Sequence, residues 1–190
     1  MPIVTRRSGS AATAQLWKSC VCKHSRVRVP PPPHMTLWKL PPIIKIYEAL
    51  GCVADGRIEV DGNSAKVHSS SGNKYYIVSY DPNTSAIMCN DNGSFWQGYL
   101  GYPAISYLLK NGVIPYTASL ANLLRDIAWK DVNTKFKNDW DKTEKYCQSI
   151  VMERGGDLPA LLKEIESIYN YLKANPFSLL GKKTKPPSGY

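Results

Sequence analysis

The residues best suited to binding or chemistry gather in one short segment, Asn90 to Tyr102. Its thirteen residues hold four aromatic side chains, three glycines and a polar Asn-Asp-Asn start. Aromatic faces stack on bases, sugars or peptide rings, and glycines let backbone amides come close to a ligand. We therefore predict a ligand-binding loop with these site residues: Asn90, Asp91, Asn92, Phe95, Trp96, Gln97, Tyr99 and Tyr102.

The same segment also has a purely structural interpretation. Its aromatic side chains would then cover a sheet, and its glycines would serve tight turns. Pro103 follows at once and is typical of the first turn of a helix, whose start attracts anions. Both interpretations stay open at this point.

Motifs for catalysis or for tight metal binding are scarce. His68 is the only histidine after residue 34, and the chain holds no G-x-S-x-G elbow, P-loop or G-x-G-x-x-G pattern. Asp55 and Asp91 stand at the ends of expected elements, where catalytic carboxylates often lie, although Asp55 before Gly56 is also typical of a turn. We therefore expect no catalytic residue, no metal site and no cofactor.

The stretch around Cys89 resembles the SWIM-type zinc finger, whose ligands are a C-x-C pair and a C-x-H pair at the start of a helix. Cys89 matches one ligand, while Asp91, Tyr102 and Ala104 stand where the other three would fall. The resemblance covers about 40 residues. It implies a finger in which aromatic packing replaces zinc.

The cysteines give no disulfide or zinc framework. The spacing of Cys20, Cys22, His24 and His34 lacks the usual knuckle of a zinc site. Cys52, Cys89 and Cys147 are odd in number and far apart, which predicts buried, reduced thiols in a cytoplasmic protein.

The net charge of +9 comes from the two ends of the chain. Residues 1–34 hold six bases and no acid, and residues 181–190 hold three lysines, so residues 35–180 balance 15 bases against 15 acids. We expect a disordered leader rich in Arg and Pro over 1–34, a single domain over 35–180, and a flexible basic tail over 181–190.

Three accounts of the leader stay open. It is a translated extension upstream of a natural start at Met35, a flexible basic arm that binds a polyanion, or an organelle transit segment. It lacks the apolar core of a secretory signal. No apolar run in the chain approaches the roughly 18 residues that a membrane-spanning helix needs, so an integral membrane protein is excluded and no membrane partner is expected.

Hydrophobic periodicity gives the elements that must position the loop. A helix of about three turns follows Pro41-Pro42 and ends at Gly51, and four short strands lie near residues 57–61, 65–68, 74–80 and 85–90. Further helices are expected from Pro103, from Thr117, over 130–153 and over 158–172. The fold class is α+β: an N-terminal helix, a four-stranded antiparallel β-meander, then about four α-helices packed on the sheet.

Two functions from different classes fit these features. The first is a non-catalytic binding module that contacts nucleic acid through the loop 90–102 and the basic termini, or a protein partner instead. The alternative is a small enzyme that uses a carboxylate and tyrosine cleft beside the same loop. A cleft that encloses Asp91, with Asp55 or His68 within hydrogen-bond distance, favours the enzyme, and a flat aromatic surface favours the binding module.

Overall fold

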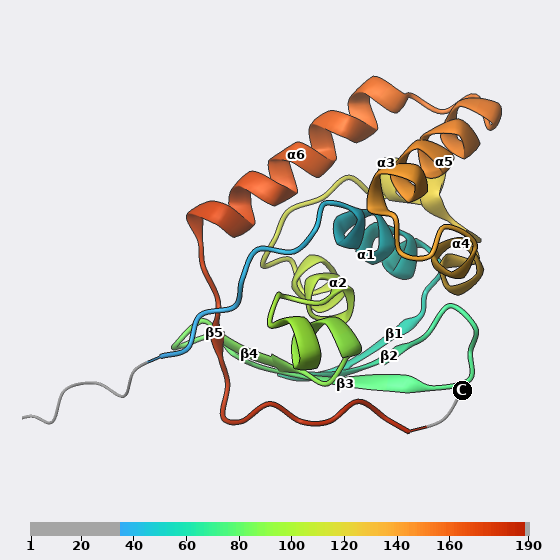
Figure 1. Cartoon of the computed structure of the whole chain (residues 1–190). Helices are drawn as coiled ribbons and strands as arrows, with labels where there is room; N and C mark the ends of the chain where they lie inside the picture. Colours follow the sequence, from blue (N-terminus) through green and yellow to red (C-terminus); the bar gives the residue numbers. More distant parts are fainter. Residues whose placement is uncertain (1–34, 189–190) are drawn as a thin grey trace, which may run out of the picture. The chain divides into compact units, whose positions relative to one another are not determined.

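The computed structural model describes residues 35–188, so the leader predicted over 1–34 lies outside the described residues. Within this range the α+β prediction is confirmed (Figure 1). The elements follow in this order: α1 (Ile44–Ala54), β1 (Ile58–Asp61), β2 (Ser64–His68), β3 (Tyr75–Asp81), β4 (Ala86–Cys89), the π-helical turn η1 (Gly93–Gln97), α2 (Tyr102–Lys110), α3 (Ala118–Ala121), the 3-10 turn η2 (Asn122–Leu124), α4 (Trp129–Lys135), α5 (Trp140–Glu153), α6 (Leu158–Ala174) and β5 (Ser178–Leu179).

The sheet contains the predicted meander and one strand more. Strands β1 to β4 pair antiparallel in sequence order, and β5 joins the edge by pairing parallel with β4. Alternate residues of β2 and β3, among them Val67 and Val78, are buried on the face that the helices cover. With only two residues, β5 is too short to show any periodicity in the sequence.

The helices form more than one layer. Helix α2 packs on the strands, α1 packs on α2, and α5 and α6 pack on the far side of α1 (Figure 1). Of the helices predicted after the meander, α2 makes the contacts with the strands, while α5 and α6 lie outside α1. Because α1 lies between other elements, nearly all of its side chains are buried, including the charged Lys45 and Glu48. None of the described helices is long and apolar enough to cross a membrane.

Helix α1 has the predicted three turns but continues past its predicted end, because Gly51 lies within it. A Cβ atom at this position would lie 2.9 Å from the carbonyl oxygen of Leu124 and 2.9 Å from Nε1 of Trp129. The glycine therefore allows a close approach of two segments. The helix ends one turn later, at Asp55 and Gly56, where Gly56 adopts a left-handed φ of 67°.

The helix predicted over 130–153 is two helices. Lys137 and Asn138 adopt left-handed φ values of 51° and 60°, and Asp139 then caps α5 by accepting a hydrogen bond from the Lys142 amide at 3.1 Å. The helix expected from Thr117 is also shorter, with four residues in α3 before the 3-10 turn. Asp157 caps α6, since its Oδ1 accepts from the Ala160 amide at 2.9 Å.

The segment before α1 ties distant parts of the chain together. The Trp38 amide donates to the Phe177 carbonyl at 3.0 Å, and the Lys39 amide donates to the Gly98 carbonyl at 3.0 Å.

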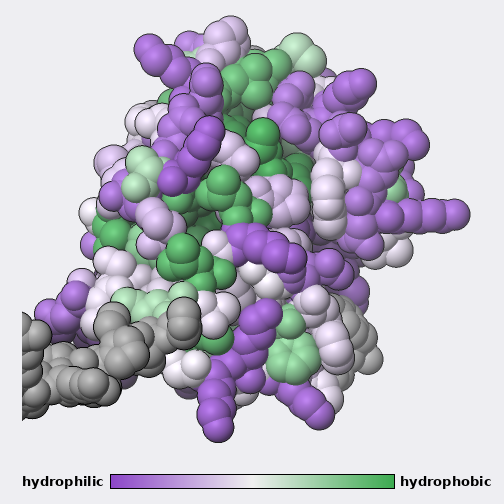
Figure 2. Space-filling model, turned by 60° about the vertical axis from the view of Figure 1, so that its left-hand side comes forward, coloured by the Kyte–Doolittle hydropathy of each residue, from purple (hydrophilic) through white to green (hydrophobic). Residues whose placement is uncertain are grey.

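Figure 2 shows a band of apolar side chains between polar ones on one face of the molecule. Among the described residues, the large exposed hydrophobic side chains include Leu37, Leu40, Ile43 and Leu162.

The three cysteines within residues 35–188 are free and buried, as predicted. Burial raises the pKa of all three thiols, and that of Cys147 to about 12. We expect iodoacetamide at pH 8 to leave Cys52, Cys89 and Cys147 unmodified in the native protein and to alkylate them in urea. Peptide mass spectrometry measures this, and alkylation of any of the three before unfolding would contradict the buried placement.

Candidate functional site

A cleft of about 1100 Å³ lies beside the predicted loop. Its walls come from α1, the turn between β2 and β3, the segment after β4, α4 and the start of α5. Six of the eight predicted site residues line it: Asp91, Asn92, Trp96, Gln97, Tyr99 and Tyr102. The surface beside the loop is therefore hollow and not a flat aromatic platform.

The other two predicted residues support the loop from outside the cleft lining. Asn90 is buried, and its Oδ1 accepts a hydrogen bond from the Ile77 amide at 2.7 Å, which joins the start of the loop to β3. Phe95 packs edge-to-face against Trp96 with ring centroids 4.7 Å apart. Phe95 therefore steadies the exposed indole.

The loop is built on the buried carboxylate of Asp91. Its Oδ2 accepts from the amides of Gly93 and Ser94 at 2.9 and 3.2 Å, and its Oδ1 accepts from the Ser94 hydroxyl. The Ser94 oxygen in turn accepts from the Gly101 amide at 3.1 Å. Burial raises the pKa of Asp91, against the opposing effect of the donors from Ser94, Cys89 and Gly93. Apart from Cys89 at the end of β4, these partners lie within the loop, so the carboxylate fixes the conformation of the loop.

The predicted irregular loop contains one turn of π-helix, from Gly93 to Gln97. Gly98 ends it with a left-handed φ of 74°, and the turn leaves the Trp96 side chain 69% exposed at the cleft. The Tyr99 ring folds back over Gly93, where a Cβ atom would meet the phenol oxygen at 2.5 Å. The glycines are therefore required by close contacts and by backbone conformation.

Basic side chains dominate the cleft. It is lined by five of them, Lys45, Arg57, Lys74, Lys130 and Lys137, and by two carboxylates, Glu48 and Asp91. Both carboxylates already accept hydrogen bonds from neighbouring groups. A domain whose charges balance overall thus gathers positive charge in one concave place.

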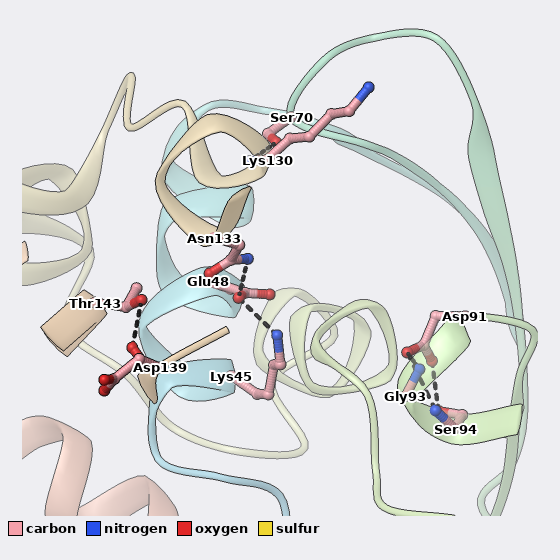
Figure 3. A network of polar contacts seen from close by, with 10 residues as sticks. All are labelled: Lys45, Glu48, Ser70, Asp91, Gly93, Ser94, Lys130, Asn133, Asp139 and Thr143. Carbon is pink, nitrogen blue, oxygen red and sulfur yellow. Dashed lines mark hydrogen bonds and ion pairs between the residues drawn. The ribbon is translucent and has the colours of Figure 1, made fainter. Parts of the chain in front are cut away.

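A buried ion pair forms one wall of the cleft. Lys45 Nζ lies 2.7 Å from Glu48 Oε1, and the two side chains are only 10% and 4% exposed. The Asn133 Nδ2 donates to the same Oε1 at 3.0 Å, which links α4 to α1 (Figure 3). Lys45 Nζ also lies 4.4 Å from the centre of the Trp140 ring. Within residues 35–188, the buried Oδ1 of Asn133 has no hydrogen-bond partner.

A fixed guanidinium contributes to another part of the cleft. Arg57 Nε donates to Asp55 Oδ2 at 2.8 Å, and Nη1 donates to the His68 carbonyl at 3.0 Å. Its buried Nη2 has no partner among the described residues. Asp55 and His68 themselves do not line the cleft, and His68 Nε2 instead lies 3.1 Å from Glu59 Oε1. The juxtaposition with Asp91 that would favour an enzyme is therefore not made.

Part of the domain matches a known protein family. The family described as uncharacterised conserved protein UCP014422 matches residues 38–178. The chain belongs to this family. The matched range contains every residue that lines the cleft and does not reach the basic tail. Neither the curated proteins nor the solved structures gave a match.

Three of the four positions that carry the zinc-finger resemblance, Cys89, Asp91 and Ala104, come together. The Cys89 thiol forms hydrogen bonds with Asp91 and with the backbone of Ala104, and Tyr102 packs edge-on against Tyr76 with ring centroids 6.0 Å apart. Across the described part of the chain, no group of three or more His, Cys, Asp and Glu residues is placed to hold a metal ion.

The grouping of five basic side chains in the cleft was not predicted from the sequence. Lys45 and Glu48 stand three residues apart in an apolar helix, a pattern typical of a solvated outer face, yet both are buried. Arg57, Lys74 and Lys130 lie in three further segments with no shared motif. Only the fold brings these charges together, so no local pattern could have shown them.

Proposed function

We propose that the chain is a non-catalytic binding module whose cleft takes a short stretch of single-stranded nucleic acid. The observation that carries this proposal is the pairing of five basic side chains with aromatic walls in one cleft. Single strands are bound in this way elsewhere, since cations follow the phosphates while aromatic rings stack on the bases. The basic tail would add charge-dependent affinity.

Trp96 supplies the stacking surface in this proposal. Its indole is largely exposed and is held by the perpendicular ring of Phe95. A rigid aromatic side chain loses little conformational entropy when a base stacks on it. In the wall of the cleft, Asn133 Oδ1 offers a hydrogen-bond acceptor that suits the exocyclic amino group of a base.

A small enzyme is the second candidate, favoured by the buried Lys45 and Glu48 in the same cleft as Tyr99. Burial and the carboxylates of Asp91 and Glu48 raise the pKa of Tyr99, so its phenol stays protonated at neutral pH and would act as a donor. Shortening of the oligonucleotide during a binding experiment, followed on a gel, would favour this candidate.

The test is a fluorescence titration of the full chain with single-stranded DNA and RNA oligonucleotides. We expect Trp96→Ala to weaken binding by about 1–3 kcal/mol, the usual contribution of a stacked base, with little change in stability because the side chain is exposed. Tyr75→Ala is the matched control, because Tyr75 is 48% exposed and does not line the cleft.

The salt dependence separates the cleft from the basic ends. If the cleft binds, Trp96→Ala lowers the affinity at low and at moderate salt alike. Equal affinities of the wild type and both variants, with a steep loss of binding in salt, would mean that the termini act as polycations and that the proposal for the cleft is wrong.

A further inference from the structure

We infer that the part of the cleft lined by Arg57, Lys74, Tyr102 and the serine turn 69–71 is a seat, that is a binding site, for a phosphate group. This inference rests on the proposed function, because it assigns the phosphate of the nucleic acid to a defined place. The seat does not include Trp96, so the seat and the stacking surface can be tested with separate variants.

The guanidinium of Arg57 is held ready for an anion. Two of its nitrogens are fixed by Asp55 and by the His68 carbonyl, and the third, Nη2, is buried without a partner in the part of the chain that the structure describes. A planar guanidinium donates to phosphate oxygens with strong directional preference. Because the group is already immobile, it loses no further freedom when an anion binds.

Asp55 does not compete for this seat. It contacts Arg57 through Oδ2, and its Oδ1 accepts from the Asp126 amide at 2.8 Å. Asp55 is also not among the residues that line the cleft. The Asp55 carboxylate therefore holds the Arg57 guanidinium in place, as residues around a binding site often orient its functional groups.

Other donors surround the guanidinium. Lys74 is 9% exposed, with its Nζ 5.4 Å from the centre of the Tyr76 ring. Tyr76 packs edge-on against Tyr102, and the Tyr102 phenol lies near enough to Arg57 for the guanidinium to affect its pKa. Burial raises the pKa of Tyr102, so the hydroxyl remains a donor at neutral pH.

The serine turn also lines the cleft. Ser70 Oγ accepts from the Lys130 amide at 3.0 Å, which joins the turn to the start of α4 (Figure 3). The hydroxyls of Ser69 and Ser71 lie 3.2 Å apart in the same turn. Two cations, a phenol and serine hydroxyls that line the same cleft form a donor set that suits the several acceptor oxygens of a phosphate.

The experiment is an NMR titration of the full chain with inorganic phosphate, compared with chloride at equal ionic strength. We expect phosphate to shift the amide signals of residues 69–74 and the Nε signal of Arg57 in a saturable way. Tyr102→Phe removes only the hydroxyl, and Lys74→Met keeps the aliphatic stem on Tyr76. We expect each to weaken phosphate binding about tenfold. Met152→Ala, at an exposed residue that does not line the cleft, should leave phosphate binding unchanged.

The possible results distinguish the phosphate seat from the nucleic-acid function. If phosphate gives no saturable shift, or if neither variant weakens it, the seat is overturned, even where oligonucleotides bind through Trp96. If phosphate binds as expected and oligonucleotides do not, the seat stands and the nucleic-acid function falls. A phosphopeptide or a small phosphorylated molecule, titrated next, would then identify the source of the phosphate.

Discussion

Replacing Asp91 with alanine is expected to lower the free energy of unfolding by about 3–5 kcal/mol, a large part of the stability of a small domain. The carboxylate accepts hydrogen bonds from the amides of Gly93 and Ser94 and from the Ser94 hydroxyl, and it is 6% exposed. Without it, these donors remain in a buried turn with no acceptor. The loss of such partners costs far more than the bonds contribute when they are made.

Urea unfolding followed by tryptophan fluorescence measures this loss, and two variants bracket it. Asp91→Asn keeps one acceptor oxygen and is expected to fall between alanine and the wild type. Asp81→Ala removes a side chain that also accepts two hydrogen bonds in a turn, from the Asn83 amide and the Thr84 hydroxyl, but in solvent. If Asp91→Ala costs no more than Asp81→Ala, Asp91 does not hold the loop.

A loss of the loop should also be visible at the cleft. Gly101 lies against the Asp91 carboxylate so closely that a Cβ atom there would overlap with it. Any change that moves the carboxylate therefore moves the chain that leads into α2, and with it the positions of Tyr99 and Tyr102. The sequence predicted that Asp91 contacts a ligand. Its hydrogen bonds show that the residue also fixes the conformation of the loop.

The elements that depend on local patterns were predictable. The alternation in β2 and β3 and the aspartate cap of α6 reflect interactions between residues close in sequence, so these elements lie where the sequence places them. The features that the sequence did not reveal depend on distant partners. Strand β5 exists because β4 offers a free edge, and Gly51 is needed because Leu124 and Trp129 pack against it.

The candidate site likewise has one part that the sequence predicted and one part that it did not. Aromatic residues and glycines within thirteen positions mark the loop, and six of the eight predicted residues line the cleft. The five basic side chains that line the cleft come from positions far apart in the sequence, with 92 residues between Lys45 and Lys137. A balanced total charge conceals such an arrangement, because composition does not show on which face each charge lies.

Breaking the buried ion pair of Lys45 and Glu48 is expected to have the second large effect on stability. Glu48→Ala should lower the free energy of unfolding by about 3–5 kcal/mol, because Lys45 would remain charged and buried without its partner. The Asn133 amide would lose its acceptor at the same time. Urea unfolding again gives the number, and Glu144→Ala is the control, since Glu144 is a half-buried glutamate that binds Tyr47 and Gln148.

A double variant shows whether the pair is kept for stability or for binding. Lys45→Met with Glu48→Gln removes both charges, keeps their shape and leaves Asn133 an acceptor. Buried ion pairs can often be replaced in this way with little loss of stability. We therefore expect the double variant to regain most of the wild-type stability while its affinity for a single-stranded oligonucleotide falls, because the strand loses its contact with Lys45 although the net charge of the cleft is unchanged. A double variant that binds as well as the wild type would instead show that Lys45 has no part in ligand binding.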